Sequence, residues 1–337
     1  MDNIYILMIA ALAILAIADL VVGVSNDAVN FLNSAIGSKA VSFKTIMIVA
    51  SLGVAFGALS SSGMMEVARK GIFMPSEFYF NEIMIIFMAV MITDILLLDF
   101  FNTLGMPTST TVSIVFELLG AAVVMSLIKI STSDSQTIAD LGQYINTAKA
   151  TEIILGILLS VVVAFSIGAF VQYNTRLLLT FNFEQKAKWV SALFGGIAAT
   201  AITYFILIKG LKGASFVSGD FKLFISENAM IIVALSFIFW TALCSLITAV
   251  FKMSVYKFII IIGTFAIAMA FAGNDLVNFI GVPIAAWQSY EAWVASGVPA
   301  TEFSMEVMSK KVPTPSLLLF LAGLVMVLTL WFSKKAK

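Results

Sequence analysis

Two nearly identical polar hexapeptides stand in strongly apolar surroundings. Residues 26–31 read Asn-Asp-Ala-Val-Asn-Phe and residues 274–279 read Asn-Asp-Leu-Val-Asn-Phe, so five of the six positions agree. An aspartate at the depth of a membrane costs about 2.5–3.5 kcal/mol on insertion scales. Neither copy contains a lysine or arginine that could neutralise the aspartate. A bound cation is the simplest partner for this repeated charge.

The spacing within each copy places an acid and an amide on one helix face. Asp27 and Asn30 are three residues apart, as are Asp275 and Asn278, and Ser34 continues the first face. Carboxylate, amide and freed backbone oxygens form a hard oxygen site that suits Na⁺ or an exchanging proton. The alternative is that these side chains hydrogen-bond helices together. We predict that the cation is bound by Asn26, Asp27, Asn30, Asn274, Asp275 and Asn278, with Asp27 and Asp275 as the Na⁺ ligands.

A second polar cluster, residues 102–111, reads Asn-Thr-Leu-Gly-Met-Pro-Thr-Ser-Thr-Thr. Gly105 and Pro107 predict the end of one helix and the start of another, which a hydroxyl residue caps. The first turn of a helix has unpaired N–H groups and the positive end of the helix dipole, and both suit an oxyanion. An ordinary capped helix start is the alternative. The predicted anion ligands are Ser109, Thr110 and Thr111.

Further acids fall within or beside apolar stretches, at Asp19, Asp94, Asp99 and Glu117. Ionisable residues inside membrane spans are commonly functional. These acids could line a transport pathway or carry protons, or they could pair with lysines or backbone groups at the ends of spans. We predict a pathway role for Ser34, Glu117 and Asp94.

The composition restricts which elements can position these residues. Of 337 residues, 61% are hydrophobic and 11% are charged, against about 25% charged in soluble domains. Nineteen basic and nineteen acidic residues balance, which argues against a nucleic-acid partner. The absence of histidine excludes histidine-based metal, haem and triad sites, and the single Cys244 excludes an internal disulfide. The chain is therefore predicted to be an all-α polytopic membrane protein without a cofactor.

Apolar stretches near the 20 or so residues that cross a bilayer predict nine spans. Short basic inner loops and the basic C-terminus favour an N-terminus on the outside. The predicted spans are 4–24, 45–65, 83–101, 109–129, 153–175, 189–208, 228–251, 258–274 and 312–333.

The two hexapeptides follow spans that cross in opposite directions, the first and the eighth. The stretch 4–37 is too long for one simple span, which predicts a helix that is broken at the Asn-Asp pair. Paired interruptions in oppositely directed spans are typical of inverted-repeat transporters. We predict a first transmembrane repeat at 1–130, connecting transmembrane helices at 131–254 and the start of a second inverted repeat, incomplete, at 255–337.

These motifs resemble the inorganic phosphate transporter family, the sodium- or proton-coupled phosphate permeases. That family carries a duplicated Gly-Ala-Asn-Asp-Val-Ala-Asn-Ala signature, which is similar to residues 24–31 and 272–279 here. It also carries Pro-Val-Ser-Thr-Thr-His twice, which is similar to one stretch here, residues 107–112. The family's histidine is Val112, and a second Ser-Thr-Thr copy is absent. The chain is therefore expected to be the front part of a longer transporter that ends inside its second repeat.

The resemblance implies that phosphate lies near the membrane midplane, between the two repeats of a multi-pass protein in the plasma or inner membrane. Ser109, Thr110 and Thr111 would contact the phosphate. Asp27 and Asp275, with Asn30 and Asn278, would bind the coupling cation or lie next to it. A homo-oligomer or a missing C-terminal half would complete the site.

The function that these observations favour is symport of inorganic phosphate with Na⁺ or H⁺ by alternating access. Transport of another oxyanion such as sulfate is a close alternative, because hydroxyls and helix N-termini bind both anions. A phosphate-binding membrane sensor or subunit that transports nothing is a second alternative. An intramembrane enzyme is poorly supported, since Ser109 has no histidine to act as its base.

Overall fold

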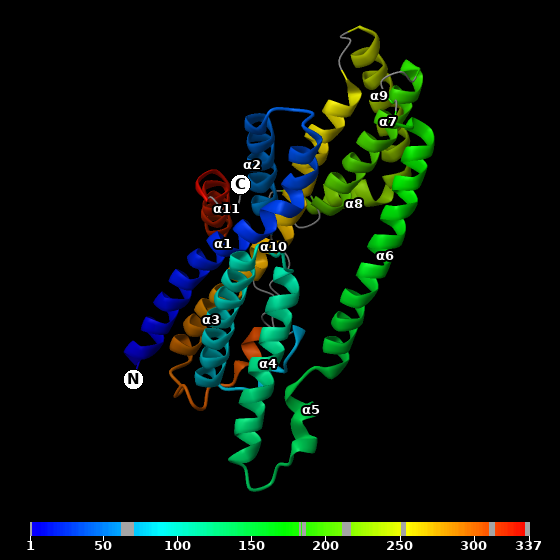
Figure 1. Cartoon of the computed structure of the whole chain (residues 1–337). Coiled ribbons are helices and arrows are strands. Elements are labelled where there is room, and N and C mark those ends of the chain that lie inside the picture. The colour runs from blue at the N-terminus through cyan, green and yellow to red at the C-terminus, as the bar shows by residue number, and fades with distance from the viewer. Residues whose placement is uncertain are drawn as a thin grey trace. The chain divides into compact units, whose positions relative to one another are not determined.

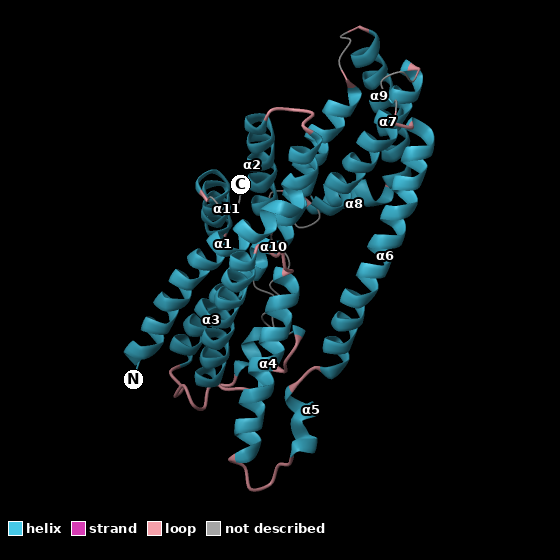
Figure 2. Cartoon of the chain, in the orientation of Figure 1, coloured by secondary structure: helices cyan, strands magenta, loops and turns pink. Residues whose placement is uncertain are grey.

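The computed structural model describes residues 2–61, 71–181, 183, 187–210, 217–250, 254–309 and 314–333. Within these ranges the chain is helical, and its extended contacts are two isolated bridges, Phe73 to Ile145 and Tyr79 to Ser304 (Figure 2). The α-helices are α1 (Asp2–Ser38), α2 (Phe43–Ser60), α3 (Phe80–Leu104), α4 (Thr110–Ser131), α5 (Leu141–Tyr144), α6 (Thr147–Leu179), α7 (Lys188–Phe205), α8 (Gly219–Glu227), α9 (Ala229–Ala249), α10 (Val255–Ser296) and α11 (Ser316–Phe332).

Eight helices in the described ranges are long and apolar enough to cross a membrane, which confirms the prediction of an all-α polytopic protein. The ninth predicted span corresponds to α11, whose 17 residues lie at the lower limit for a bilayer crossing. Parts of the spans 45–65 and 312–333 lie outside the described residues. So do Lys334, Lys335 and Lys337, on which the predicted orientation partly depends.

The predicted helix breaks at the two hexapeptides are wrong. α1 is one helix of 37 residues and α10 is one helix of 42 residues, and each passes through its hexapeptide without interruption. Asn and Asp have only moderately low helix propensity, so two such residues do not stop a long apolar helix. The backbone carbonyls there remain in the helix and are not freed as ligands. The polar chemistry must therefore come from side chains.

The chain divides into two compact units that interleave along the sequence. The first contains the described residues of Met1–Asn30, Ser61–Leu155 and Asn274–Lys337, and the second those of Phe31–Ser60 and Gly156–Gly273. Both hexapeptides' Asn-Asp pairs and the hydroxyl cluster belong to the first unit, whereas Ser34 belongs to the second. The division into repeats at 1–130, 131–254 and 255–337 stays a prediction.

In the first unit, α3 and α4 form a hairpin whose turn carries the hydroxyl cluster (Figure 1). Gly105 ends α3 with a φ of 68°, in the left-handed region that glycine adopts without strain. At the other end of the hairpin, the Lys129 ammonium donates to the Glu82 carboxylate at 2.8 Å and lies 4.6 Å from the centre of the Tyr79 ring. These contacts fix both ends of the hairpin.

Also in the first unit, α1 and α10 pack together and run in opposite directions (Figure 1). The Tyr5 ring contacts the Trp293 ring at 5.1 Å between centroids. Further along α1, a side chain at Gly23 would collide with the Phe279 ring. Between these two contacts the residue numbers increase along α1 and decrease along α10, so the two helices are antiparallel. This crossing brings the two Asn-Asp pairs to the same level.

In the second unit, α2 packs closely against the first half of α10 through Gly53 and Gly57. A Cβ at Gly57 would collide with the backbone carbonyl of Met269, which cannot move aside as a side chain can. Small residues four apart are a common basis of helix contact in membranes. The absence of a side chain at Gly57 is therefore required by the packing.

Gly57→Ala is expected to destabilise the protein by about 1–3 kcal/mol, as overpacked cores do. Thermal unfolding of the purified protein in detergent measures this loss. Gly156→Ala in α6 is the matched control, because nothing lies within 4 Å of the added Cβ. Equal melting temperatures for the two variants would contradict the packing argument.

Candidate functional site

The Asn26 side chain fastens α1 to the turn between α3 and α4. Its amide nitrogen donates to Asn102 Oδ1 at 2.9 Å and to the Met106 carbonyl at 3.2 Å. Its Oδ1 accepts from the Thr108 N–H at 2.8 Å, and Asn102 in turn donates to the Val22 carbonyl at 2.8 Å. All donors and the acceptor oxygen of the Asn26 amide are thus engaged. The geometry favours a structural role for this residue over direct cation binding.

This network sets the position at which α4 begins. The sequence predicts a cap at Thr108 or Ser109; Ser109 is the N-cap, and its hydroxyl accepts from the Val112 N–H at 3.3 Å. Among the described residues, no acceptor is recorded for the N–H groups of Ser109, Thr110 and Thr111. These three donors and the positive end of the helix dipole lie together in one turn, which is the chemistry that binds an oxyanion.

The second hexapeptide touches the hydroxyl cluster directly. The Asn278 amide nitrogen donates to Thr111 Oγ1 at 2.9 Å, to Thr110 Oγ1 at 3.4 Å and to Asp275 Oδ1 at 3.3 Å. The same amide nitrogen therefore links the Asp275 carboxylate to the Thr110 and Thr111 hydroxyls. Residues 164 or more positions apart in the sequence therefore form one polar cluster. The oxygen of the Asn278 amide has no recorded partner among the described residues.

Asp27 and Asp275 are both buried, with 5% and 7% of their surfaces exposed. They are close enough to interact electrostatically, and neither has an ion pair with a described lysine or arginine. Asp27 also has no recorded hydrogen bond within the described ranges. Two buried carboxylates that interact electrostatically, with no counter-ion among the described residues, are costly. A cation between them would remove that cost.

The remaining predicted site residues are exposed and make few recorded contacts. Asn30 and Asn274 are exposed, and Asn274 donates to its neighbour Asp275 at 3.1 Å. Ser34 is exposed on the part of α1 that belongs to the second unit. Within the described ranges, no group of three or more acids is arranged to hold a metal ion. A monovalent cation held by two carboxylates and an amide is compatible with that finding.

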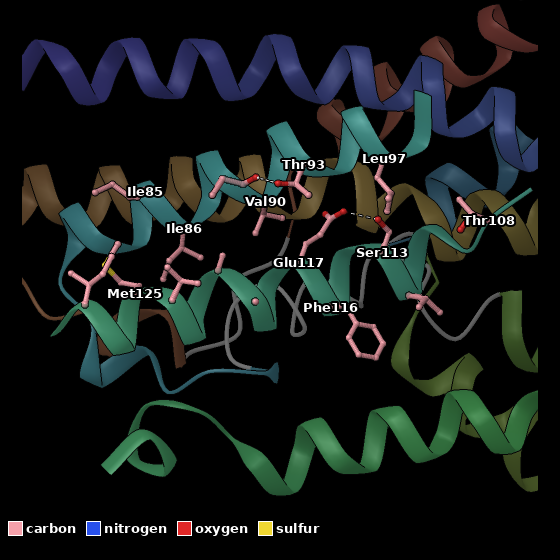
Figure 3. Close-up of a pocket in the computed structure, with 16 residues that line it drawn as sticks. Ile85, Ile86, Val90, Thr93, Leu97, Thr108, Ser113, Phe116, Glu117 and Met125 are labelled. Carbon is pink, nitrogen blue, oxygen red and sulfur yellow. Dashed lines mark hydrogen bonds between the residues drawn. The ribbon is translucent and has the colours of Figure 1, made fainter. Parts of the chain in front are cut away.

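The other intramembrane acids form a separate cluster in the first unit. The Ser113 hydroxyl lies 2.6 Å from Asp94 Oδ1 and 2.7 Å from Glu117 Oε1, and Asp19 is close enough to Asp94 to interact electrostatically. Glu117 and Ser113 also line a groove of about 670 Å³ between α3 and α4 (Figure 3). The sequence indicates the acids but not Ser113, which resembles any other serine in an apolar helix.

The long apolar helices and the buried polar centre that they position define a multi-pass membrane transporter. Residues 23–335 match the phosphate transporter family, and the chain belongs to that family. The predicted resemblance is thereby confirmed, and the protein is a phosphate transporter by family and not an enzyme.

Relatives named as phosphate permeases occur in Pyrococcus abyssi and Thermococcus kodakarensis. Each is 26% identical to this chain, in an alignment that covers 89% of this chain and 68% of the relative. A solved structure titled as the sodium-dependent phosphate transporter is similar with a TM-score of 0.71. At 20% identity it covers 97% of this chain and 76% of its own length. That likeness shows a common fold.

Proposed function

We propose that this chain carries inorganic phosphate across the cell membrane together with Na⁺, by alternating access. The observation that carries the proposal is the contact between the second hexapeptide and the start of α4. The Asn278 amide nitrogen donates to the Asp275 carboxylate and to the Thr110 and Thr111 hydroxyls, which would hold the anion. One group of side chains can therefore respond to both ions.

The cation would lie between Asp27 and Asp275, with the free amide oxygen of Asn278 as a third ligand. All three donors are oxygens, which Na⁺ prefers. Two unit charges 4 Å apart repel each other by about 4 kcal/mol at an effective dielectric constant of 20. Binding a cation would replace this repulsion by attraction. A Na⁺ ion can be coordinated by both carboxylates and the amide oxygen at once, so it uses all three ligands.

Coupling between the ions follows from the Thr110 and Thr111 hydroxyls. Without a cation, they face the Asp275 carboxylate, whose negative charge repels an oxyanion. A bound Na⁺ would compensate that charge and release the hydroxyls to donate to the anion. The unpaired N–H groups of Ser109, Thr110 and Thr111 would supply the remaining donors. Sodium binding would therefore precede and strengthen phosphate binding.

Phosphate is favoured over sulfate by the same acid. Phosphate at neutral pH still carries a proton that it can donate to a carboxylate, and sulfate does not. Asp275 shares the Asn278 amide nitrogen with the Thr110 and Thr111 hydroxyls, so it would lie near the bound anion. A carboxylate in that place accepts a hydrogen bond from the protonated anion and repels the fully ionised one.

Uptake of labelled phosphate into proteoliposomes tests the proposal. We expect accumulation with an inward Na⁺ gradient and little with an equal K⁺ gradient, and excess sulfate should compete weakly. Uptake that follows a proton gradient alone would assign H⁺ as the coupling ion. Binding of phosphate without accumulation under any gradient would contradict transport and favour a sensor or subunit.

A further inference from the structure

Three buried acids lie in the first unit outside the proposed phosphate and sodium site. Asp19 belongs to α1, Asp94 to α3 and Glu117 to α4. Asp19 and Asp94 have no exposed surface, and Glu117 is partly buried. Such acids are expensive in a membrane unless a ligand or a proton neutralises them. Neither the phosphate site nor the cation site proposed above uses them.

The hydrogen bonds of Ser113 show that the cluster holds a proton. The Ser113 hydroxyl lies 2.6 Å from Asp94 Oδ1 and 2.7 Å from Glu117 Oε1, both hydrogen-bonding distances. A serine hydroxyl has only one hydrogen to donate, but it can also accept. Two ionised carboxylates cannot both receive that hydrogen. One of the two carboxyl groups must therefore be protonated and donate to Ser113 Oγ.

The buried carboxyl group of Asp19 is a second, independent indication that this cluster binds a ligand. Both of its carboxyl oxygens are fully buried and have no hydrogen-bond partner in the described structure. Asp94, Glu117 and Asp27 are close enough to affect the Asp19 carboxyl group electrostatically. Buried carboxyl groups that interact in this way repel each other when all are ionised, and protonation of one relieves the repulsion. Asp94 Oδ2 and Glu117 Oε2 are likewise buried and unpartnered.

No described basic residue neutralises the cluster. Lys129, on the same helix as Glu117, is paired with Glu82, and its twelve-residue separation from Glu117 corresponds to about 18 Å along α4. The other charged groups that face the cluster are acids, Asp27 directly and Asp275 through Asp27. A proton is the ligand that the two hydrogen bonds of Ser113 require.

We propose that Asp19, Asp94 and Glu117, joined through Ser113, form a proton-binding site within the helix bundle of the first unit. The proton lies between Asp94 and Glu117 on the Ser113 hydroxyl. Glu117 lines the groove between α3 and α4 and is the member through which protons exchange with the surroundings (Figure 3). This site uses other residues than the sodium pair Asp27 and Asp275, and Asp27 is close enough to influence it electrostatically.

Infrared spectroscopy of the purified full-length protein tests the site directly. We expect a carbonyl band of protonated carboxyl groups at neutral pH, which shifts on transfer to D₂O. Asp94→Asn and Glu117→Gln should each reduce or remove it. Asp220→Asn in α8 is the control, because Asp220 is exposed, and it should leave the band unchanged. Circular dichroism of each variant verifies that the helices are retained.

Ser113→Ala separates the proposed proton site from a merely buried acid. Ser113→Ala removes the hydroxyl oxygen that accepts from the protonated carboxyl group. The frequency of the carbonyl band should therefore change. The proposal is overturned if the wild-type protein has no such band at neutral pH. It is also overturned if the band appears only after Na⁺ is removed, which would mark the cluster as a cation site. Loss of uptake with the band intact would instead contradict the proposed transport function alone.

Discussion

Asp275→Asn is expected to weaken sodium-driven phosphate uptake strongly while the protein still folds. The substitution keeps the size of the side chain but removes the charge that would attract the cation and respond to it. Hydrogen bonds to charged groups contribute about 1.5–3 kcal/mol, so losing the charge should lower the apparent Na⁺ affinity by about 10- to 100-fold. Proteoliposome uptake over a series of Na⁺ concentrations measures this loss.

Asp27→Asn should have the same effect, because the proposed cation lies between the two carboxylates. Both aspartates are buried, so each variant needs a test of folding by size-exclusion chromatography and thermal melting. Asp220→Asn, at an exposed position of α8, is the matched control and should transport normally. If both buried variants kept full sodium-dependent uptake, the two-carboxylate cation site would be wrong.

The parts of the structure that the sequence predicts well depend on local chemistry. Gly105, Pro107 and Ser109 mark the end of α3 and the start of α4, because left-handed backbone, a missing N–H and a capping hydroxyl act within a few residues. Long apolar stretches likewise identify the spans. Such signals are read along the chain and need no knowledge of neighbouring helices.

The predictions that the structure contradicts depend on contacts between residues that are distant in the sequence. The hexapeptides were predicted to break their helices, but the backbone of α1 and α10 continues and the polar side chains find partners across the unit. Asn26 is an example: its partners Asn102, Met106 and Thr108 lie 76 to 82 positions away. The sequence cannot distinguish an asparagine that binds a cation from one that fastens helices, because both are polar residues in an apolar span.

Asn278 differs in the same way from its counterpart in the first hexapeptide, Asn30, which is exposed. Its amide nitrogen contacts Thr110 and Thr111, and its oxygen remains without a recorded partner. The two copies of one motif therefore have different surroundings in this chain. Identical residue types in a repeat indicate related positions, but the neighbouring helix decides which of their atoms stay free.

Asn26→Ala tests that difference and is expected to weaken phosphate binding by displacing the start of α4. The substitution leaves the Thr108 N–H, the Met106 carbonyl and the Asn102 amide without their partner. A buried unsatisfied group costs about 1–3 kcal/mol, so the apparent Michaelis constant for phosphate should rise by about tenfold or more. The melting temperature should also fall. Uptake at saturating Na⁺, over a series of phosphate concentrations, measures the first effect.

The contrast with Asp275→Asn distinguishes a positioning residue from a cation ligand. Asn26→Ala should change the dependence on phosphate and leave the dependence on Na⁺ nearly unchanged once phosphate saturates, because the two carboxylates remain. Asn174→Ala is the matched control, since its exposed amide makes one local bond to the Phe170 carbonyl in α6. A selective loss of Na⁺ affinity in Asn26→Ala would instead make Asn26 a cation ligand, as its place in the hexapeptide first suggests.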